Sequence, residues 1–259
     1  MKKVLVILVT YNGMQWLSRC LGSVKDADIF VVDNDSTDGS ADWIQGNYPD
    51  AKLVRSAENL GFSKANNLGF EFALKKGYEF VYLLNQDAWL EDGALDKLLE
   101  SADSQPEYAV LSPLQMTDGY KELDRQFKKD KTPPAAHWLV RADAIRKVGL
   151  FNEDLFPFYG QDDDWCNRAR FHCWKIGIVP DARGVHDRAQ RKESKDRIID
   201  RNYRIGSLVR LANPNVPMWL SYIYVLAFTF VKAIKYRSLK VFKYFFGINR
   251  QLSDLRRLH

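Results

Sequence analysis

Runs of consecutive apolar residues alternate with segments of helical periodicity over the first 112 residues. The runs are rich in β-branched side chains, as in strands buried on both faces, and they predict strands at 4–10, 29–32 and 80–84, with a short one at 52–55. Apolar residues three or four apart predict helices at 14–24, from residue 40, and at 63–76. Strands alternating with helices through short connections predict an α/β fold, a parallel sheet covered on both faces.

The pattern is looser beyond Pro113. A strand is predicted at 135–140, and helices are predicted at 162–173 and 196–211. The stretch 118–134 is polar, charged and proline-ended, which predicts a mobile loop.

Composition is that of an ordinary globular protein. Of 259 residues, 46% are hydrophobic and 27% charged, which excludes bulk disorder. The three cysteines show no paired spacing, so we expect neither a disulfide framework nor a zinc site, and the odd count fits a reducing compartment. The apolar run after Met1 ends at Thr10, too early for the core of a signal peptide, so we interpret it as the first strand.

The segment 214–259 differs in charge from the rest of the chain. It carries +7, and because the whole chain is +5, residues 1–213 carry −2. Residues 216–231 hold no charge, a run shorter than the roughly 20 residues that span a bilayer, and basic and aromatic residues then intermingle. This pattern is typical of amphipathic helices at an anionic membrane surface. Core helices with a solvated basic face are the alternative, and contact with nucleic acid fits least well.

Three of the predicted strands end in polar residues. These are Thr10, Tyr11 and Asn12 at the end of the first strand, Asp33, Asn34 and Asp35 at the end of the second, and Asn85, Gln86 and Asp87 at the end of the fourth. Ligands of open α/β sheets bind beyond the carboxyl ends of the strands, although such residues also form ordinary turns. The chain has neither the Gly-rich dinucleotide fingerprint nor a P-loop. A bound phosphate would therefore need a divalent cation held by carboxylates.

A second polar cluster opens the helix predicted at 162–173. Asp162, Asp163 and Asp164 are consecutive, and they follow the aromatic stretch 156–159. An acidic first turn is the structural alternative, because helix N-termini favour negative charge. A carboxylate beside an aromatic wall has a raised pKa and can act as a general base. His186 stands alone in sequence, as most structural histidines do, yet neutral imidazole is a good ligand for Mn²⁺-type ions.

These motifs together resemble glycosyltransferase family 2, the inverting nucleotide-sugar enzymes of GT-A fold, and most closely its bacterial rhamnosyltransferase-like members. The resemblance covers roughly residues 3–213. It is carried by VLVILVTYNGMQWLSRCLGSV, IFVVDNDSTDGS, ENLGFSKANNLG, LLNQDAWL, VGLFNEDLFPFYGQDDDWCNRAR and VPDARGVH, which follow in family order. No segment is specific by itself, but their order and spacing are.

The resemblance implies a role for each matching residue. Nucleotide-sugar binding falls to Thr10, Tyr11, Asn12, Asp33, Asn59, Gly61, Asn66 and Asn85, with Asp33 accepting the N3–H of a pyrimidine. Asp87 and His186 would hold Mn²⁺ or Mg²⁺ at the diphosphate, and Asp162 would be the general base. His137, Trp138 and Asp164 would line the acceptor and sugar pocket, with Asp164 and Arg168 also ordering the helix.

Two positions depart from the common family pattern. Asn85 replaces the first Asp of the metal-binding D-x-D, as in the rhamnosyltransferase-like form, and Gln161 replaces the Glu of a Glu-Asp pair. Gln keeps the size but loses the charge, so an inactive glycosyltransferase-like scaffold is one alternative. A nucleotidyltransferase is another alternative. It is disfavoured because a loop that holds a triphosphate after the first strand would be rich in glycine and carry a Lys or Arg, and only Gly13 is present.

The sequence therefore predicts an inverting, metal-dependent glycosyltransferase, with GT-A fold in a mixed, mainly parallel sheet. Residues 1–213 would form the enzyme, with a nucleotide-binding half at 1–112 and an acceptor half at 113–213. The donor would be a UDP- or dTDP-sugar and the acceptor a glycan or a lipid-linked acceptor. Residues 214–259 would hold the protein peripherally on the cytoplasmic face of the plasma membrane, and nucleic acid is not an expected partner.

Overall fold

The computed structural model describes residues 4–24, 26–117, 132–187, 200–237 and 239–250. Eight strands in this part of the chain form one sheet, in the order β3-β2-β1-β4-β7-β6-β8-β5. The first four are parallel: β1 (Val4–Thr10), β2 (Asp28–Asp33), β3 (Lys52–Arg55) and β4 (Phe80–Asn85). Their positions agree with the predicted runs, because strands buried on both faces need apolar residues at successive positions.

The second half of the sheet is mixed, and most of it was not predicted. It contains β5 (Ala88–Leu90), β6 (Tyr108–Met116), β7 (His137–Arg141) and β8 (Lys175–His186). β7 runs antiparallel to both β4 and β6, while β8 is parallel to β6 and antiparallel to β5. Only β7 matches a predicted strand. The sheet is thus mixed and mainly parallel, and the predicted fold class is confirmed.

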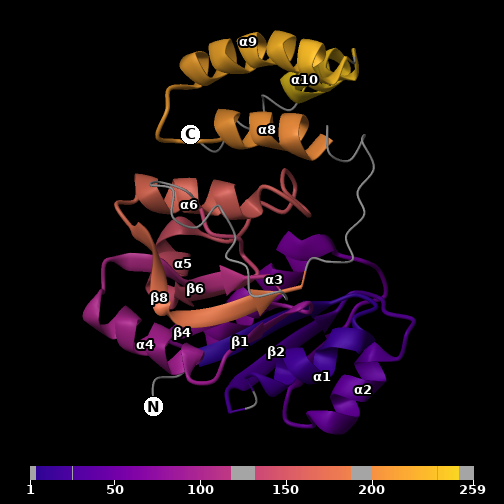
Figure 1. Ribbon diagram of the computed structural model, residues 1–259, viewed down its shortest axis with the longest axis vertical. Helices are drawn as coiled ribbons and strands as arrows, with labels where there is room; N and C mark the ends of the chain where they lie inside the picture. The colour runs from indigo at the N-terminus through magenta and orange to yellow at the C-terminus, as the bar shows by residue number, and fades with distance from the viewer. Residues whose placement is uncertain (1–3, 25, 118–131, 188–199, 238, 251–259) are drawn as a thin grey trace.

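Helices cover both faces of the sheet (Figure 1). One face packs on α1 (Met14–Gly22), α2 (Ser40–Asn47) and α4 (Ala94–Ser104). The other packs on α3 (Gly61–Lys76), α5 (Ala142–Val148) and α6 (Gln161–Phe171). Neither α4 nor α5 was predicted. Most of the loop expected at 118–134 lies outside the described residues.

The C-terminal helices form a third core, stacked beyond α6 at one end of the molecule (Figure 1). They are η1 (Asp200–Ile205), α8 (Gly206–Leu211), α9 (Met218–Tyr236) and α10 (Lys240–Arg250). η1 and α8 cover part of the helix predicted at 196–211, whose first residues lie outside the described part. Tyr203 and Leu208 pack in the same core as Val225 and Phe245. The predicted boundary at 213 remains a prediction, but the core of the tail begins before it.

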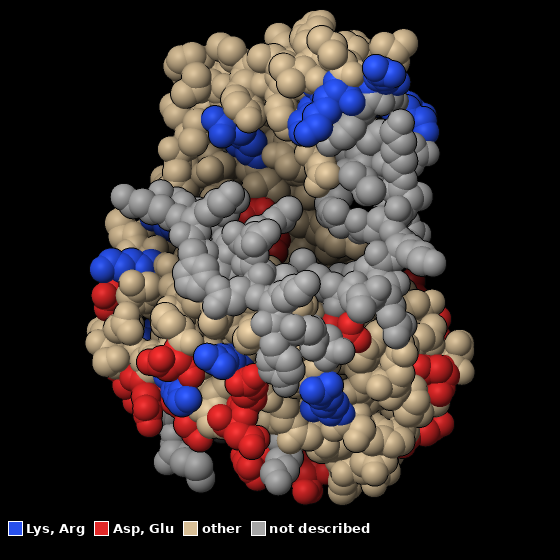
Figure 2. All heavy atoms as spheres, viewed as in Figure 1, with Lys and Arg blue, Asp and Glu red and all other residues tan. Residues whose placement is uncertain are grey.

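Helix α9 buries two polar residues and exposes several large apolar ones. Ser221 and Thr229 are fully buried, and Thr229 bonds the Tyr203 hydroxyl at 2.6 Å. Trp219 is 66% exposed and Ile234 79% exposed. On the face shown in Figure 2, basic side chains appear among uncharged ones on the terminal helices, whereas acidic side chains appear only on the body.

The length of α9 bears on the prediction that the uncharged run is too short to span a bilayer. The helix continues past the run, and its 18-residue window 218–235 has a mean hydropathy of 1.3 with 17% of the window buried. By length and composition alone, α9 is therefore long and apolar enough to cross a membrane.

Candidate active site

The strand ends that carry the predicted site lie side by side at one edge of the sheet. Thr10 at the end of β1 is the register partner of Asp33 at the end of β2, and Val9 is that of Asn85 at the end of β4. Parallel pairing forces this, because parallel strands end at the same edge. The three polar strand ends are therefore neighbours in space, as the sequence predicted.

Asp33 presents a buried carboxylate oxygen to this edge. The residue is 3% exposed, and its Oδ2 accepts a hydrogen bond from the Ser36 backbone N–H at 3.1 Å. Its Oδ1 is also buried and has no hydrogen-bond partner among the described residues. A buried acceptor without a partner costs about 1–3 kcal/mol, a cost that a ligand N–H would relieve.

Gln86 joins the ends of β1 and β4, a role that the sequence analysis missed. Its Oε1 accepts from the Thr10 hydroxyl at 2.9 Å and from the Tyr11 N–H at 2.8 Å, and its Nε2 donates to the Tyr11 carbonyl at 3.2 Å. A Cβ on Gly13 would lie 2.5 Å from Gln86 Oε1 and 2.6 Å from Thr10 Oγ1, so a larger residue there would displace the Gln86 amide. Tyr11 is left 49% exposed beside the edge, where its ring is open to a ligand.

Asn12 ties the loop after β1 to the loop after β2. Its backbone adopts a positive φ of 49°, a conformation that asparagine tolerates better than most residues. Its N–H donates to Ser36 Oγ at 2.9 Å, and its Oδ1 accepts from the Thr37 N–H at 2.8 Å. The role of Asn12 in this structure is to hold the loop that flanks Asp33.

The start of α3 connects the sheet edge beside Asp33 to the loop before α6. Asn59 Oδ1 accepts from the Gly61 N–H at 2.9 Å, and Asn34 Nδ2 donates to the Gly61 carbonyl at 3.1 Å. A Cβ on Gly61 would come within 2.8 Å of the Pro157 carbonyl, and its φ is +78°. Asn66, predicted at the nucleotide pocket, is 2% exposed and donates to the Phe62 carbonyl of its own helix.

Asp87 and His186 meet because β5 and β8 are neighbouring antiparallel strands at one edge of the sheet. β5 and β8 pair so that Ala88 faces His186. Asp87 Oδ1 lies 3.3 Å from His186 Nε2, with the two side chains 7% and 2% exposed. Asp187 N–H donates to the Asp87 carbonyl at 2.8 Å and holds the pair together. Proximity of these two residues is what the sequence predicted for a metal site.

The pair has the donor chemistry and spacing for a divalent ion. Two ligand atoms at roughly 2.1 Å from one ion, at right angles, lie about 3 Å apart, and Asp87 Oδ1 and His186 Nε2 are 3.3 Å apart. No group of three His, Cys, Asp or Glu side chains that could hold a metal occurs among the described residues. Two protein ligands fit an ion that takes its remaining oxygens from phosphate and water.

His137 and Trp138, predicted in the sugar pocket, are both completely buried. The His137 ring bonds the Tyr82 hydroxyl at 2.8 Å and the Val185 carbonyl at 3.0 Å. Because a carbonyl only accepts, Nε2 carries the proton and Nδ1 accepts from Tyr82. Burial lowers the pKa of His137 to about 3, so the ring is neutral. In this structure His137 supports the strand of His186, and Trp138 donates to the Pro133 carbonyl at 3.0 Å.

Asp162 opens α6 beside the end of β4. Its carboxylate accepts from the Ala135 backbone N–H, and the next carbonyl, that of Ala136, accepts from Asn85 N–H at 3.1 Å. Desolvation by burial, reinforced by the neighbouring charge of Asp163, raises the pKa of Asp162 to about 7. The carboxylate therefore lies near the end of β4, and its pKa is suited to a general base at neutral pH.

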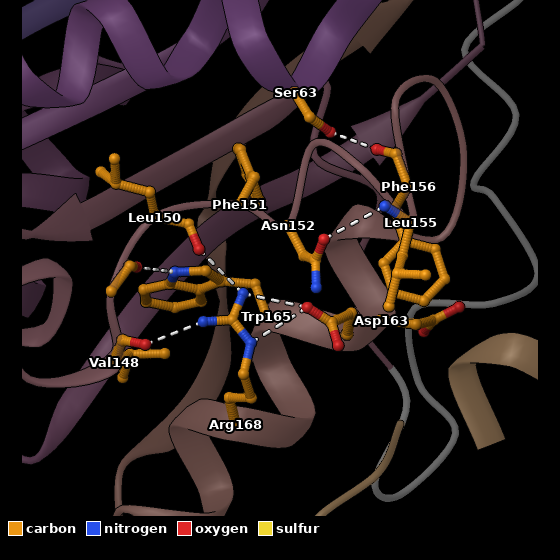
Figure 3. Close-up of polar contacts among 12 residues, drawn as sticks. Ser63, Val148, Leu150, Phe151, Asn152, Leu155, Phe156, Asp163, Trp165 and Arg168 are labelled. Atoms are coloured by element: carbon orange, nitrogen blue, oxygen red, sulfur yellow. Dashed lines mark hydrogen bonds and ion pairs between the residues drawn. The ribbon is translucent and has the colours of Figure 1, made fainter. Parts of the chain in front are cut away.

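Asp164 holds α6 in place rather than facing the pocket. It is 1% exposed and binds Arg168 through an ion pair at 2.9 Å. The Arg168 guanidinium also donates to the Val148 and Leu150 carbonyls at 2.8 and 2.9 Å (Figure 3). These contacts fix the axis of the helix that carries Asp162.

The loop before α6 forms an exposed aromatic wall. Phe158 is 53% and Tyr159 is 46% exposed, and the loop is anchored where the Ser63 hydroxyl donates to the Phe156 carbonyl (Figure 3). Gln161 is 6% exposed, and its Oε1 is buried without a hydrogen-bond partner. The wall, Gln161 and Asp162 thus share one side of the candidate site.

Comparison with known proteins identifies relatives over most of the chain. The sequence profile of the family described as "Glycosyl transferase family 2" matches residues 5–154. That segment contains the nucleotide edge and Asp87 but ends before Asp162 and His186. The N-acetylglucosaminyl-diphospho-decaprenol L-rhamnosyltransferase of Mycobacterium tuberculosis is 26% identical, over 71% of this chain and 76% of that protein.

Solved structures share the fold at low sequence identity. A mannosyltransferase from Pyrobaculum calidifontis in complex with GDP-Man and Mn²⁺ superposes with a TM-score of 0.65 at 16% identity, covering 98% of this chain and 82% of that one. The S. aureus protein TarS, fragment 1–349 with UDP-GlcNAc, gives a TM-score of 0.62 at 17% identity, covering 85% and 69%. These similarities establish the GT-A glycosyltransferase fold.

Proposed function

Because the chain belongs to glycosyl transferase family 2, we propose that it transfers a sugar, with inversion, from a UDP- or dTDP-sugar to a lipid-linked glycan. The observation that carries the proposal is the set of polar side chains that meet at one edge of the sheet. There the buried Oδ1 of Asp33 has no partner, Asp87 meets His186, and Asp162 has a pKa of about 7. These are the three chemical parts that such a reaction requires.

The donor nucleotide binds at the Asp33 corner. Asp33 Oδ1 accepts the N3–H of uracil or thymine, and this hydrogen bond satisfies the buried oxygen. The exposed ring of Tyr11 lies against the base, while Gln86 holds Thr10 and Tyr11 in place. Cytosine lacks an N–H at this ring position, so the corner selects against it.

Asp87 and His186 would hold Mn²⁺ or Mg²⁺ beside the diphosphate. When bound, the ion neutralises the negative charge that develops on the leaving diphosphate. The buried surroundings of the pair strengthen that electrostatic contribution. His137 is a positioning residue, since its Nε2–H binds the carbonyl of Val185, the residue before His186.

Asp162 takes the proton from the acceptor hydroxyl. As the acceptor oxygen attacks the anomeric carbon, its O–H proton moves to the Asp162 carboxylate. A new C–O bond forms while the bond between the anomeric carbon and the diphosphate oxygen breaks, and its electron pair leaves with the nucleoside diphosphate. Attack on the face opposite the leaving group inverts the configuration.

The C-terminal helices place the enzyme on a membrane, where lipid-linked acceptors reside. Trp219, Ile223, Phe230 and Ile234 are each at least 55% exposed on one side of α9, which is unfavourable in water. The basic residues of the tail favour an anionic, cytoplasmic surface. The mycobacterial relative acts on a diphospho-decaprenol acceptor, which supports an acceptor of the same class here.

Calorimetric titration with UDP and with dTDP, each with Mn²⁺ and with EDTA, tests the donor site. We expect metal-dependent binding that Asp33→Asn weakens at least tenfold, because Asn places an N–H where an acceptor is needed. Asp35→Asn is the matched control: the same chemical change at an exposed position two residues away. Absence of binding by either nucleotide would contradict the proposal and favour a scaffold without activity.

A further inference from the structure

A cavity of about 270 Å³ lies between α6, α8 and α9, outside the candidate active site. Its lining contains one charged side chain, Arg210, and no acid. The remaining polar lining comes from Ser207 and from Asn167, Asn202 and Asn213. Amides, a hydroxyl and a guanidinium all offer hydrogen-bond donors, so the cavity suits an anion.

Two buried polar atoms of the lining lack partners. Ser207 is 2% exposed, and within the described part of the chain neither its Oγ nor Arg210 Nε has a hydrogen-bond partner. The guanidinium is held in place, because its carbon lies 4.0 Å from the centre of the Tyr224 ring. Buried donors that are fixed in position but not satisfied by the protein indicate a ligand that supplies acceptors.

The walls of the cavity are built into the fold. Asn215 Nδ2 donates to the Asn167 carbonyl at 2.8 Å, which ties the link between α8 and α9 to α6. Asn215 also bonds Asn213 Oδ1 through its backbone N–H at 2.9 Å. Phe228 closes the α9 side, and a second cation, Lys232 Nζ, lies 4.7 Å from the centre of its ring.

The cavity borders the exposed apolar face of α9. Tyr224 lines the cavity and is 47% exposed, and its neighbour Ile223 is 55% exposed on the outer face. A molecule with an anionic head and an apolar chain could place the head in the cavity and the chain along α9. We propose that this cavity binds the phosphate headgroup of a membrane lipid, a site separate from that of the donor nucleotide.

The proposal depends on the proposed membrane attachment only because the membrane would supply the lipid. A soluble lipid therefore tests the cavity without any membrane. Dihexanoyl phosphatidic acid, below its micelle concentration and with EDTA present, is titrated into the full-length protein. Inorganic phosphate and dihexanoyl phosphatidylcholine are titrated in parallel. We expect the phosphatidic acid to bind at least tenfold more tightly than either. Equal binding of inorganic phosphate would overturn the lipid assignment, and no binding of any probe would overturn the site.

Variants then locate the binding. Arg210→Gln should weaken phosphatidic acid binding at least tenfold, whereas Arg146→Gln, an equal loss of charge at an exposed surface pair, should not. Asn202→Asp adds a negative charge at an exposed rim position without disturbing the core, and it should also weaken binding. Unchanged affinity in both cavity variants would refute the proposal.

The donor site is followed separately in the same proteins. Asp87→Asn should lose metal-dependent UDP binding but keep phosphatidic acid binding, and Arg210→Gln should show the reverse. Failure of the lipid site would thus leave the nucleotide result intact, and failure of the proposed function would leave the lipid result intact. Loss of both ligands in Arg210→Gln would mean that the cavity is not an independent site.

Discussion

In the sheet, β1, β2 and β4 bury apolar residues on both faces and collect their polar residues at one edge, whereas α9 buries Ser221 and Thr229 and exposes Trp219 and Ile234. The first arrangement is stable in water, since the polar strand ends are hydrogen-bonded within the protein or can bind a ligand. The second is suited to apolar surroundings, because large exposed apolar surfaces are costly in water. The proposed function assigns the first region to a soluble nucleotide and the second to a lipid surface.

The largest expected effect comes from removing the general base. Asp162→Asn should lower kcat by about 10²–10⁴-fold while UDP binding in calorimetry stays within threefold, because the base acts only on the acceptor. Asp163→Asn, the same change at the exposed neighbouring position, should retain most activity. Loss of UDP binding in a folded Asp162→Asn protein would show that Asp162 belongs to the donor site.

Charges on the outer face of α9 should release the protein from lipid. Ile223→Asp with Phe230→Asp removes two exposed apolar side chains, each worth roughly 1.5–3 kcal/mol when buried, so binding to anionic vesicles should fall at least a hundredfold in a flotation assay. Phe171→Asp, at a 55% exposed phenylalanine on α6, is the control. Equal vesicle binding by the double variant would refute the membrane role of α9, and UDP binding should not change.

The pKa of Asp162 predicts the pH dependence of both activity and stability. Its value of about 7, raised by burial and by Asp163, means that kcat should rise with pH to a plateau above about pH 8. Asp163→Asn removes a like charge and should move this rise to lower pH. Because the folded protein binds this proton more tightly than the unfolded chain, whose Asp has a pKa near 3.8, Asp162 should reduce stability progressively as pH rises from about 4 to 7.

Thermal unfolding of Asp162→Asn tests the stability part of this prediction. The neutral side chain should make the protein more stable than the wild type at pH 8 but not at pH 4. A variant that is destabilised equally at both pH values would contradict the assigned pKa.

The smallest expected effect is a loss of stability at Gly61, where the start of α3 contacts the loop before α6. Gly61→Ala should cost about 2–3 kcal/mol, because φ is +78° and the added Cβ would lie 2.8 Å from the Pro157 carbonyl. Gly77→Ala has a similar φ of +71° with nothing within 4 Å, so it should cost only about 1 kcal/mol. Denaturant unfolding of both variants measures the difference, and equal costs would show that the close approach to Pro157 is not significant.

Local pattern was sufficient for the parallel half of the sheet and for the strand ends of the site. Strands β1 to β4 were predicted to within two residues at each end, since doubly buried strands need consecutive apolar residues. In contrast, β8 was missed because its twelve residues KIGIVPDARGVH include a proline, glycines and charges. Its place depends on pairing with β6 and β5, which lie far away in sequence.

The site shows the same division. Thr10, Asp33 and Asp87 stand at the ends of predicted strands. A parallel sheet places these ends at the same edge, so their proximity could be predicted from the sequence. The structural role of Gln86 was not predicted, because it depends on three hydrogen bonds to residues 75 or 76 positions away in the chain. His137 and Asp164 matched family motifs, yet both side chains are buried and bonded inside the protein.

By itself, then, the sequence determined the fold class, the parallel half of the sheet, the carboxylates of the site and the basic, apolar character of the tail, because these follow from local periodicity and residue chemistry. Only the tertiary structure decided which polar groups are buried and paired, that His186 meets Asp87, that α9 buries Ser221 and Thr229 while it exposes large apolar side chains, and that a donor-lined cavity forms beside it. Those properties depend on contacts between distant segments, which no local pattern contains.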